Sequence, residues 1–123
     1  MAKDLRTFLA DVEKTRPNDI FVVTREVDPV FELTAVLAKL EQSGEFPAVL
    51  FKKVKGSTFP VLINLTASYE RLALSLGCTV HEMVPEFAQR FAKPLPTREV
   101  SEGPVKDVVW TGDRKSTRLN SSH

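Results

Sequence analysis

The sequence has very few of the residues that build disulfides and metal sites. Its 123 residues include one cysteine, Cys78, and two histidines, His81 and His123. A single cysteine excludes a disulfide within the chain and a cysteine-based metal cluster, and it fits a reducing intracellular setting. His81 has no partner at a metal-ligating spacing, so an ordinary exposed or half-buried histidine is the simpler interpretation.

Long apolar runs and an excess of one charge are also missing. The first 17 residues, MAKDLRTFLADVEKTRP, lack the apolar core of a signal peptide, and no run approaches the length of a membrane span. The formal net charge is +1, and residues 1–112 alone carry 14 basic and 15 acidic side chains. This balance gives no electrostatic case for nucleic acid or an anionic membrane. We therefore expect a cytoplasmic protein that binds neither.

What is present is the composition of one folded domain, with 42% hydrophobic and 27% charged residues. The first predicted helix is capped by Asp4 and closed by Pro17 and Asn18. Its apolar face comprises Leu5, Phe8, Leu9 and Val12. The second begins with Asp28 as cap and Pro29 as first residue, and Gly44 supplies a left-handed end. Its apolar stripe comprises Val30, Leu33, Val36, Leu37 and Leu40.

Two further helices follow. One is predicted over residues 68–76 and ends at Gly77. Its face comprises Tyr69, Leu72, Ala73 and Leu76. The next opens with a capping box of Thr79 and Glu82, and Pro85 predicts a kink or a restart in it. Its expected buried face comprises Phe87, Ala88 and Phe91.

Short β-branched and aromatic runs predict strands at residues 20–24, within FPAVLFKKVKG (46–56), within FPVLINL (59–65) and at VKDVVW (105–110). Residues 55–57 supply the turn between the two middle strands, and residues 92–104 form an extended connector. Strands interleaved with helices predict an α/β or α+β fold, in which helices flank a small mixed sheet.

The candidate chemistry is sparse. Lys52, Lys53 and Lys55 precede Gly56, whereas a phosphate loop has its lysine after the glycine, so the solvated side of a hairpin is the simpler interpretation and phosphate binding the alternative. Cys78 could lie near a helix N-terminus, which would lower its pKa, or be a small core residue. The acids Glu26 and Asp28 are paired only in sequence. The sequence has no dinucleotide fingerprint and no nucleophile elbow, so we assign no catalytic, cofactor-binding or metal residue.

Several phrases together resemble the N-terminal domain of the UbiD-type decarboxylases. They are REVDP followed by a helix, F-x-x-V-K-G-S-x-F-P-V-L-x-N-L, and S-x-E-R-L-A-L-x-L-G, within a resemblance that covers about residues 3–112. The resemblance implies reversible, non-oxidative decarboxylation of aromatic or α,β-unsaturated carboxylic acids. It also implies prenylated FMN with Mn²⁺ and K⁺, and a homo-oligomer.

In that family the catalytic arginine and two glutamates, and the metal ligands, lie in a central domain to which no residue here corresponds. Loss of CO₂ leaves negative charge on carbon, which the cofactor accepts while the protein supplies position and a proton. We therefore expect residues 1–112 to be a truncated N-terminal domain, inactive alone and without bound cofactor. Its partners would be the missing central and C-terminal domains of the same chain.

The last eleven residues, DRKSTRLNSSH (113–123), have no apolar period and resemble a common sequencing-library adapter translated in one frame. A basic disordered tail or a phosphorylatable segment are the alternatives. We expect this stretch to be disordered and an artefact.

Two rival functions remain open. A free-standing α/β interaction or scaffold domain would fold without exposing a large apolar face. A nucleic-acid binder acting through the three lysines would show salt-sensitive binding, which the net charge disfavours.

Overall fold

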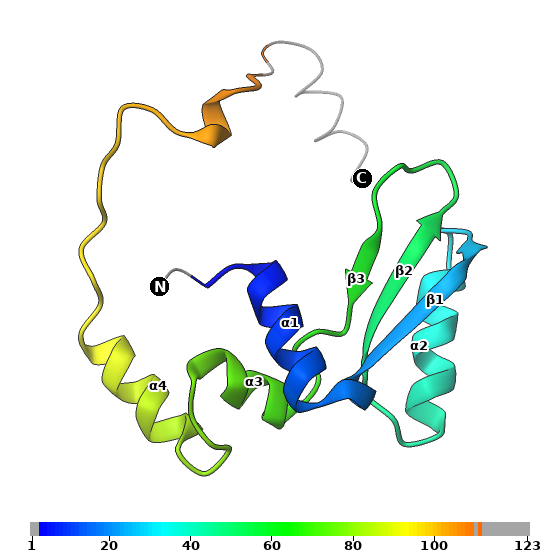
Figure 1. The fold of residues 1–123 in the computed structure, drawn as a ribbon, viewed down its shortest axis with the longest axis horizontal. Coiled ribbons are helices and arrows are strands. Elements are labelled where there is room, and N and C mark those ends of the chain that lie inside the picture. Colours follow the sequence, from blue (N-terminus) through cyan, green and yellow to red (C-terminus); the bar gives the residue numbers. More distant parts are fainter. Residues whose placement is uncertain (1–2, 110, 112–123) are drawn as a thin grey trace. The chain divides into compact units, whose positions relative to one another are not determined.

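The structure is a computed structural model that describes residues 3–109 and 111. The chain divides into two units, Met1–Lys93 and Pro94–His123. The first unit holds a sheet of three strands and four α-helices (Figure 1). The predicted α+β class is therefore confirmed.

The sheet is mixed, with the strand order β1-β2-β3. Strand β1 (Ile20–Val27) runs parallel to β2 (Ala48–Val54), which pairs antiparallel with β3 (Val61–Ile63). β1 is longer than its predicted range, 20–24, because a register shift between Val23 and Glu26 lets pairing with β2 resume. The predicted turn is present, with Gly56 at a φ of 76°.

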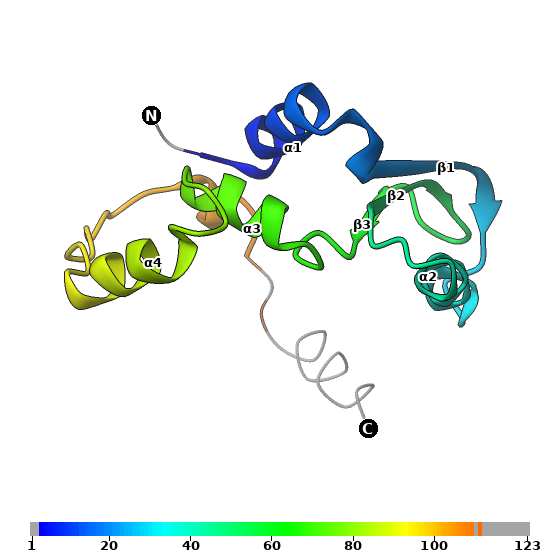
Figure 2. The same ribbon diagram turned by 90° about the horizontal axis from the view of Figure 1, so that it is seen from below.

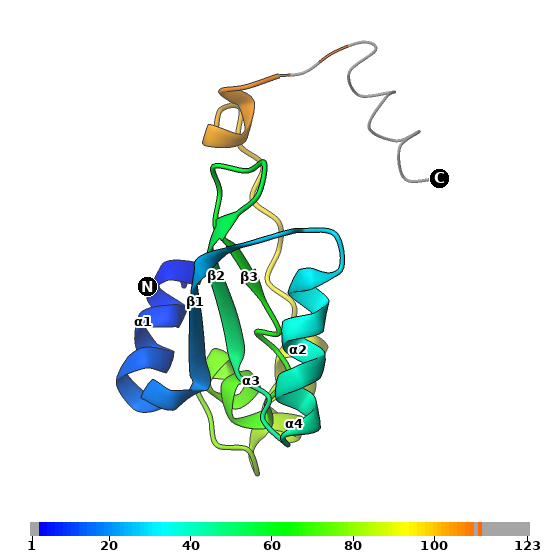
Figure 3. The same ribbon diagram turned by 90° about the vertical axis from the view of Figure 1, so that its right-hand side faces the viewer.

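Helix α2 (Glu32–Gln42) covers one face of the sheet and closes the main core there (Figure 3). The sheet contributes buried side chains from β1 and β2, namely Val23, Val27, Val49, Phe51 and Val54. The helix contributes Leu33, Val36, Leu37 and Leu40, as the apolar stripe predicts. Val30, which the stripe also predicts to be packed, precedes the helix and is exposed.

The start of α2 differs from the prediction of a helix capped by Asp28. Asp28 Oδ1 instead accepts a hydrogen bond from the Val30 amide at 2.8 Å, which closes a local turn. The N-cap residue is Phe31, in the left-handed region with a φ of 65°. Glu32 then accepts from the Asp28 amide at 2.7 Å, so the turn is stabilised from inside the helix. The helix end is as predicted, with Gly44 at a φ of 79°.

Helix α1 begins after the predicted cap Asp4, and α3 lies within the predicted range 68–76. In α1 (Leu5–Thr15), Asp4 Oδ1 accepts from the Thr7 amide at 2.8 Å, while Phe8 and Val12 are buried. In α3 (Tyr69–Leu76), Ser68 caps the start and Gly77, with a φ of 71°, ends the helix. These two helices are in contact within the first unit (Figure 2).

Helix α4 (Met83–Ala92) corrects three predictions. Glu82 Oε2 accepts hydrogen bonds from the Thr79 hydroxyl at 2.9 Å and from the Thr79 amide at 3.0 Å. These bonds close a turn before the helix, whose N-cap is Glu82. Pro85 falls in the first helical turn, where its missing N–H costs nothing, so α4 runs as one helix from Met83 and the restart predicted at Pro85 does not occur. The predicted buried face of Phe87, Ala88 and Phe91 is exposed, and the element against which α4 mainly packs is α3.

The second unit contains one short 3-10 helix, η2 (Pro104–Lys106). Residues 93–103 have no helix or strand, in agreement with the predicted connector. The strand predicted over residues 105–110 is wrong across 105–109, where Pro104 starts the 3-10 turn and no strand pairing is recorded. Trp110 and the stretch 113–123 lie outside the described residues. Within the described part of the chain, no helix has the length and apolarity needed to cross a membrane.

Candidate functional site

The histidine and the cysteine considered from the sequence, His81 and Cys78, both lie in the stretch between α3 and α4. His81 is exposed in the turn before α4. Cys78 lies just after the C-terminal end of α3, where its Sγ is 3.8 Å from the carbonyl oxygen of Ala73, and α4 begins only at Met83. It is half-buried and does not stand at the helix N-terminus considered as an alternative. Across residues 3–109 and 111, no group of three or more metal-ligating side chains comes together.

The lysines and acids around the hairpin are surface groups. Lys52, Lys53 and Lys55 are all exposed, as the simpler interpretation predicted. Lys55 Nζ lies 3.7 Å from Asp28 Oδ2. An exposed pair of this kind contributes between about 0 and 1 kcal/mol. These side chains therefore form the solvated side of the hairpin.

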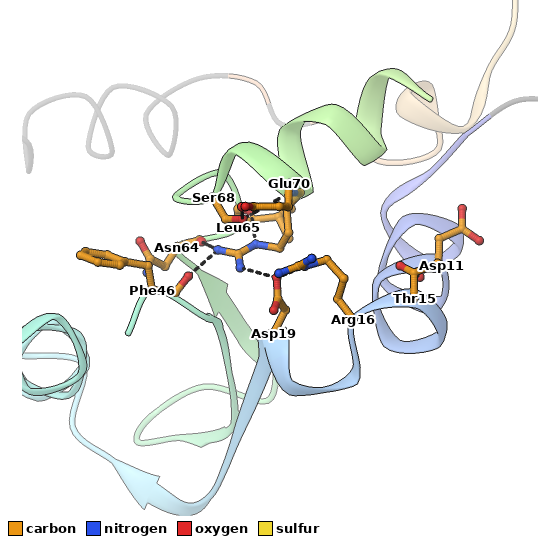
Figure 4. A network of polar contacts seen from close by, with 10 residues as sticks. Asp11, Thr15, Arg16, Asp19, Phe46, Asn64, Leu65, Ser68 and Glu70 are labelled. Atoms are coloured by element: carbon orange, nitrogen blue, oxygen red, sulfur yellow. Dashed lines mark hydrogen bonds and ion pairs between the residues drawn. The ribbon is translucent and has the colours of Figure 1, made fainter. Parts of the chain in front are cut away.

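The feature that the sequence did not single out is the buried side chain of Arg71 in α3, which is 2% exposed (Figure 4). Its Nε donates to the carbonyl oxygen of Leu65 at 2.9 Å. Its Nη2 donates to the carbonyl oxygens of Phe46 at 2.7 Å and Asn64 at 3.1 Å. Its Nη1 donates to Asp19 Oδ2 at 3.2 Å.

Arg71 therefore ties together the chain before β2, the loop after β3, and η1 (Pro17–Asp19) at the start of β1. Four of the five donors of its guanidinium are used in these bonds. Because four of its five donors are bonded to oxygen atoms of the protein, the buried Arg71 side chain serves to hold the fold together. We assign Arg71 a positioning role, in which it fixes α3 against the sheet.

Asp19 is shared by a second arginine at the edge of the same cluster. Arg16 Nε lies 2.8 Å from Asp19 Oδ2, the oxygen that also meets Arg71. Hydrogen bonding and charge attraction from Asp19 raise the pKa of Arg16 above its ordinary value. One carboxylate thus neutralises part of two positive charges. Asn64 adds a further link, because its Nδ2 donates to the Pro47 carbonyl at 3.0 Å from a left-handed backbone position.

Among the hollows formed by the described residues of the first unit, two adjoin exposed apolar side chains. One is lined by Leu9 of α1 and by Ile20, Val22 and Leu50 of the sheet. Helix α1 lies on the other side of the sheet from α2 (Figure 3). Lys52 and Glu13 also reach this hollow, so its lining is mixed. The other, which we call the α3–α4 hollow, is almost wholly apolar. It is lined by Leu72, Ser75, Leu76, Met83, Val84 and Phe87.

Sequence reasoning missed Arg71 because burial of an arginine depends on three backbone carbonyls that only the folded loops bring together. The available signal was its place in the phrase S-x-E-R-L-A-L-x-L-G, residues 68–77. The predicted burial of the apolar side of α4 was wrong for a related reason. Its apolar spacing shows that the face has to be covered, and carries no information on what covers it.

The comparisons with known proteins agree on one family. Residues 13–91 match the family model described as the 3-octaprenyl-4-hydroxybenzoate carboxy-lyase N-terminal domain. An uncharacterised protein of Synechocystis sp. is 33% identical over 105 residues, which cover 83% of this chain and 20% of that protein.

Solved structures show the same relationship. The UbiD-class enzyme HmfF from Pelotomaculum thermopropionicum, in complex with FMN, is 32% identical with a TM-score of 0.70, over 85% of this chain and 23% of that one. An evolved dimeric form of HmfF in complex with prFMN is 31% identical with a TM-score of 0.68, over 79% of this chain and 22% of that one. Vanillic acid decarboxylase of Sedimentibacter hydroxybenzoicus, in its closed form, is 31% identical with a TM-score of 0.62, over 76% of this chain and 20% of that one. The chain thus spans about a fifth of the length of its relatives.

Proposed function

The chain belongs to the UbiD family of decarboxylases, through the N-terminal domain of that family, and we propose on this basis that it is the first domain of a longer non-oxidative decarboxylase. The observation that carries the proposal is the match over residues 13–91 to a domain that makes up about a fifth of each solved relative. The substrate class of the longer protein is aromatic or α,β-unsaturated carboxylic acids.

The longer protein would use prenylated FMN, with Mn²⁺ and K⁺. Support for a flavin comes from the solved HmfF structures, which are complexes with prFMN and with FMN. The described residues of this chain do not fit either the flavin phosphate or the metal. They bring together no group of three metal-ligating side chains, and the lysines near Gly56 are exposed on a hairpin. The chemistry therefore belongs to the rest of the longer protein, and the 123-residue chain would be inactive.

The contribution of this domain is positional. The Arg71 bonds fix α3 against the sheet, so the surfaces around α3 and α4 are held in a defined arrangement. The remaining domains of the same chain would pack on such surfaces. The whole protein would be a cytoplasmic homo-oligomer.

A free-standing interaction or scaffold domain is the rival function. Such a module would be expected to cover its large apolar side chains. Here Phe21, Phe87 and Phe91 are all exposed in the first unit. This exposure favours a domain that normally packs against more protein.

We also propose that residues 1–112 belong to the domain and that residues 113–123 are of adapter origin. The nucleotide sequence tests this. Codons identical to the adapter are the expected result, whereas codons that differ from it, or genomic sequence that continues through them, would refute the assignment.

The functional proposal is tested on the continuous reading frame that contains residues 1–112. That protein, supplied with prenylated FMN and Mn²⁺, should release CO₂ from members of an acid panel that includes vanillic and cinnamic acids. The proposal would be refuted if a folded protein that retains flavin released CO₂ from none of the aromatic or α,β-unsaturated acids.

A further inference from the structure

The α3–α4 hollow and the adjoining side of α4 form a single apolar surface, which we call the α4 surface. Its members are Leu72 and Leu76 of α3 with Met83, Val84, Phe87 and Phe91 of α4. The hollow has a volume of about 430 Å³. Phe87 and Phe91 extend it along α4 as a stacked pair, with ring centroids 6.1 Å apart.

Polar contacts hold α4 in place while this apolar surface stays open. Arg90 Nη2 donates to the Leu76 carbonyl at the end of α3 at 2.7 Å, and Arg90 Nε donates to Glu86 Oε1 at 2.8 Å. The turn before α4 is closed by the Thr79–Glu82 bonds. These polar groups satisfy one another without using the apolar side of α4. The helix is therefore positioned without burying its own apolar side.

The apolar side of α4 is far more exposed than that of α2. Val84 is 72% exposed, Phe87 58% and Phe91 78%. In α2 the corresponding stripe packs on the sheet core. A short helix gains most of its stability from packing an apolar face. An open face of this kind indicates that more protein covers it.

A second copy of the chain is a poor occupant for this surface. Full burial of two phenylalanines contributes about 150–250 Å² each, so with Val84 one partner supplies roughly 400–600 Å². A stable interface between separate chains buries about 800 Å² on each side. A linked segment of the same polypeptide needs less area, because it does not lose the translational freedom of a separate molecule.

The length of the relatives supplies that linked segment. This chain covers 20–23% of each solved structure compared, so more than three quarters of each relative lies beyond the matched region. Helix α4 is the last α-helix among the described residues, and the connector that begins at Lys93 leads on from it. We propose that the polypeptide that follows residue 112 in the longer protein packs on the α4 surface. This inference rests on the proposed function, and it assigns the contact to α4 and the α3–α4 hollow.

The occupant presents apolar side chains to the surface, of which at least one enters the hollow between Leu72, Met83 and Phe87. The contact holds the first domain against the remainder of the chain. It leaves the outer side of α4 in solvent, where Gln89 is exposed.

Hydrogen exchange of peptides that cover Met83–Ala92 tests the assignment, with the 123-residue chain and the longer protein measured under the same conditions. We expect exchange in α4 to slow by about tenfold or more in the longer protein. Equal exchange in the two proteins would overturn the proposal. If protection of α4 in the short chain grew with protein concentration, a second copy would be the occupant and the proposal would be overturned. If protection in the short chain disappeared when residues 112–123 were deleted, that stretch would be the occupant and the proposal would likewise be overturned.

A pair of variants in the longer protein sharpens the test. Phe87→Gln with Phe91→Gln should abolish the added protection of α4, whereas Gln89→Ala, on the other side of the helix, should keep it. The double variant should leave the fold of the short chain unchanged, since both rings are exposed there, and exchange of β2 checks this. Full protection in a folded double variant would refute the inference.

The two proposals fail separately. An active, flavin-bound longer protein with unprotected α4 would refute the docking assignment alone. A longer protein with protected α4 that binds no flavin and releases no CO₂ would refute the proposed function and leave the docking assignment standing.

Discussion

Arg71 of α3 and Asp19 of η1 form an ion pair across 52 residues of sequence, with 3.2 Å between Nη1 and Oδ2. The arginine is almost fully buried and the carboxylate side chain is 18% exposed. Together they join the first third of the chain to the helix that bears the α3–α4 hollow. The geometry of the domain therefore depends on a contact that no local sequence pattern encodes.

Replacement of Arg71 by methionine should destabilise the domain by about 3 kcal/mol. The substitution leaves the carbonyls of Phe46, Asn64 and Leu65 without their donor. Arg71→Lys should recover only part of the loss, because an ammonium cannot reproduce the planar fork. Urea denaturation monitored by circular dichroism measures the free energy of unfolding. Arg98→Met, at an exposed arginine, is the control; a loss no larger than the control's would show that the cluster does not stabilise the fold.

The core prediction compares two phenylalanines in different environments. Phe51 is fully buried between the sheet and α2, whereas Phe59 is 76% exposed. Phe51→Ala should cost about 3–5 kcal/mol of unfolding free energy through lost burial and the cavity it leaves. Phe59→Ala should cost less than about 0.5 kcal/mol. Similar losses in the same denaturation experiment would contradict the assigned core.

The left-handed start of α2 predicts a stabilising substitution. Phe31 has a φ of 65° and its side chain is 81% exposed, so it carries backbone strain with little packing in return. Phe31→Asn should raise the free energy of unfolding by about 1 kcal/mol, since asparagine tolerates this conformation. Phe59→Asn controls for removal of an exposed ring. A Phe31→Asn protein that is less stable than the parent would mean that the aromatic side chain has contacts which this account omits.

The pH dependence of stability should reflect Glu32. Hydrogen bonds from the Asp28 amide and then from Arg25 lower the pKa of this carboxyl below its ordinary value of 4.5. A lowered folded-state pKa contributes stability above the unfolded value, and that stability is lost as pH falls through the folded value. Glu32→Gln should therefore flatten the fall in stability below about pH 4.5. Thermal unfolding at a series of acidic pH values checks the slope, with Glu41→Gln at the other end of α2 as control. An unchanged slope in Glu32→Gln would contradict the assignment.

The elements that local chemistry specifies were predictable from the sequence. Asp4 and Ser68 cap helices because their side chains reach nearby amides, and Gly44 and Gly77 take the left-handed conformation that ends a helix. The first residue of α2 was not predictable in the same way. Asp28 had two local uses, a helix cap or a turn, and Glu32 selects the turn through a hydrogen bond formed only in the fold.

The functional surface was predictable only in part. The spacing of Phe87 and Phe91 gave the apolar side of α4 correctly, but their predicted burial was wrong within the described structure. Burial depends on a neighbouring surface, which a helical period does not specify. The burial of Arg71 was unpredictable for the same reason, since its partners are carbonyl oxygens of distant loops.

The most direct test of the account is flavin retention by the 123-residue chain and by the continuous longer protein, each incubated with prenylated FMN and Mn²⁺ and passed through a desalting column. The account predicts that flavin absorbance co-elutes with the longer protein and not with the short chain. Flavin that co-elutes with the short chain in stoichiometric amount would contradict the claim that the cofactor site lies in the rest of the protein.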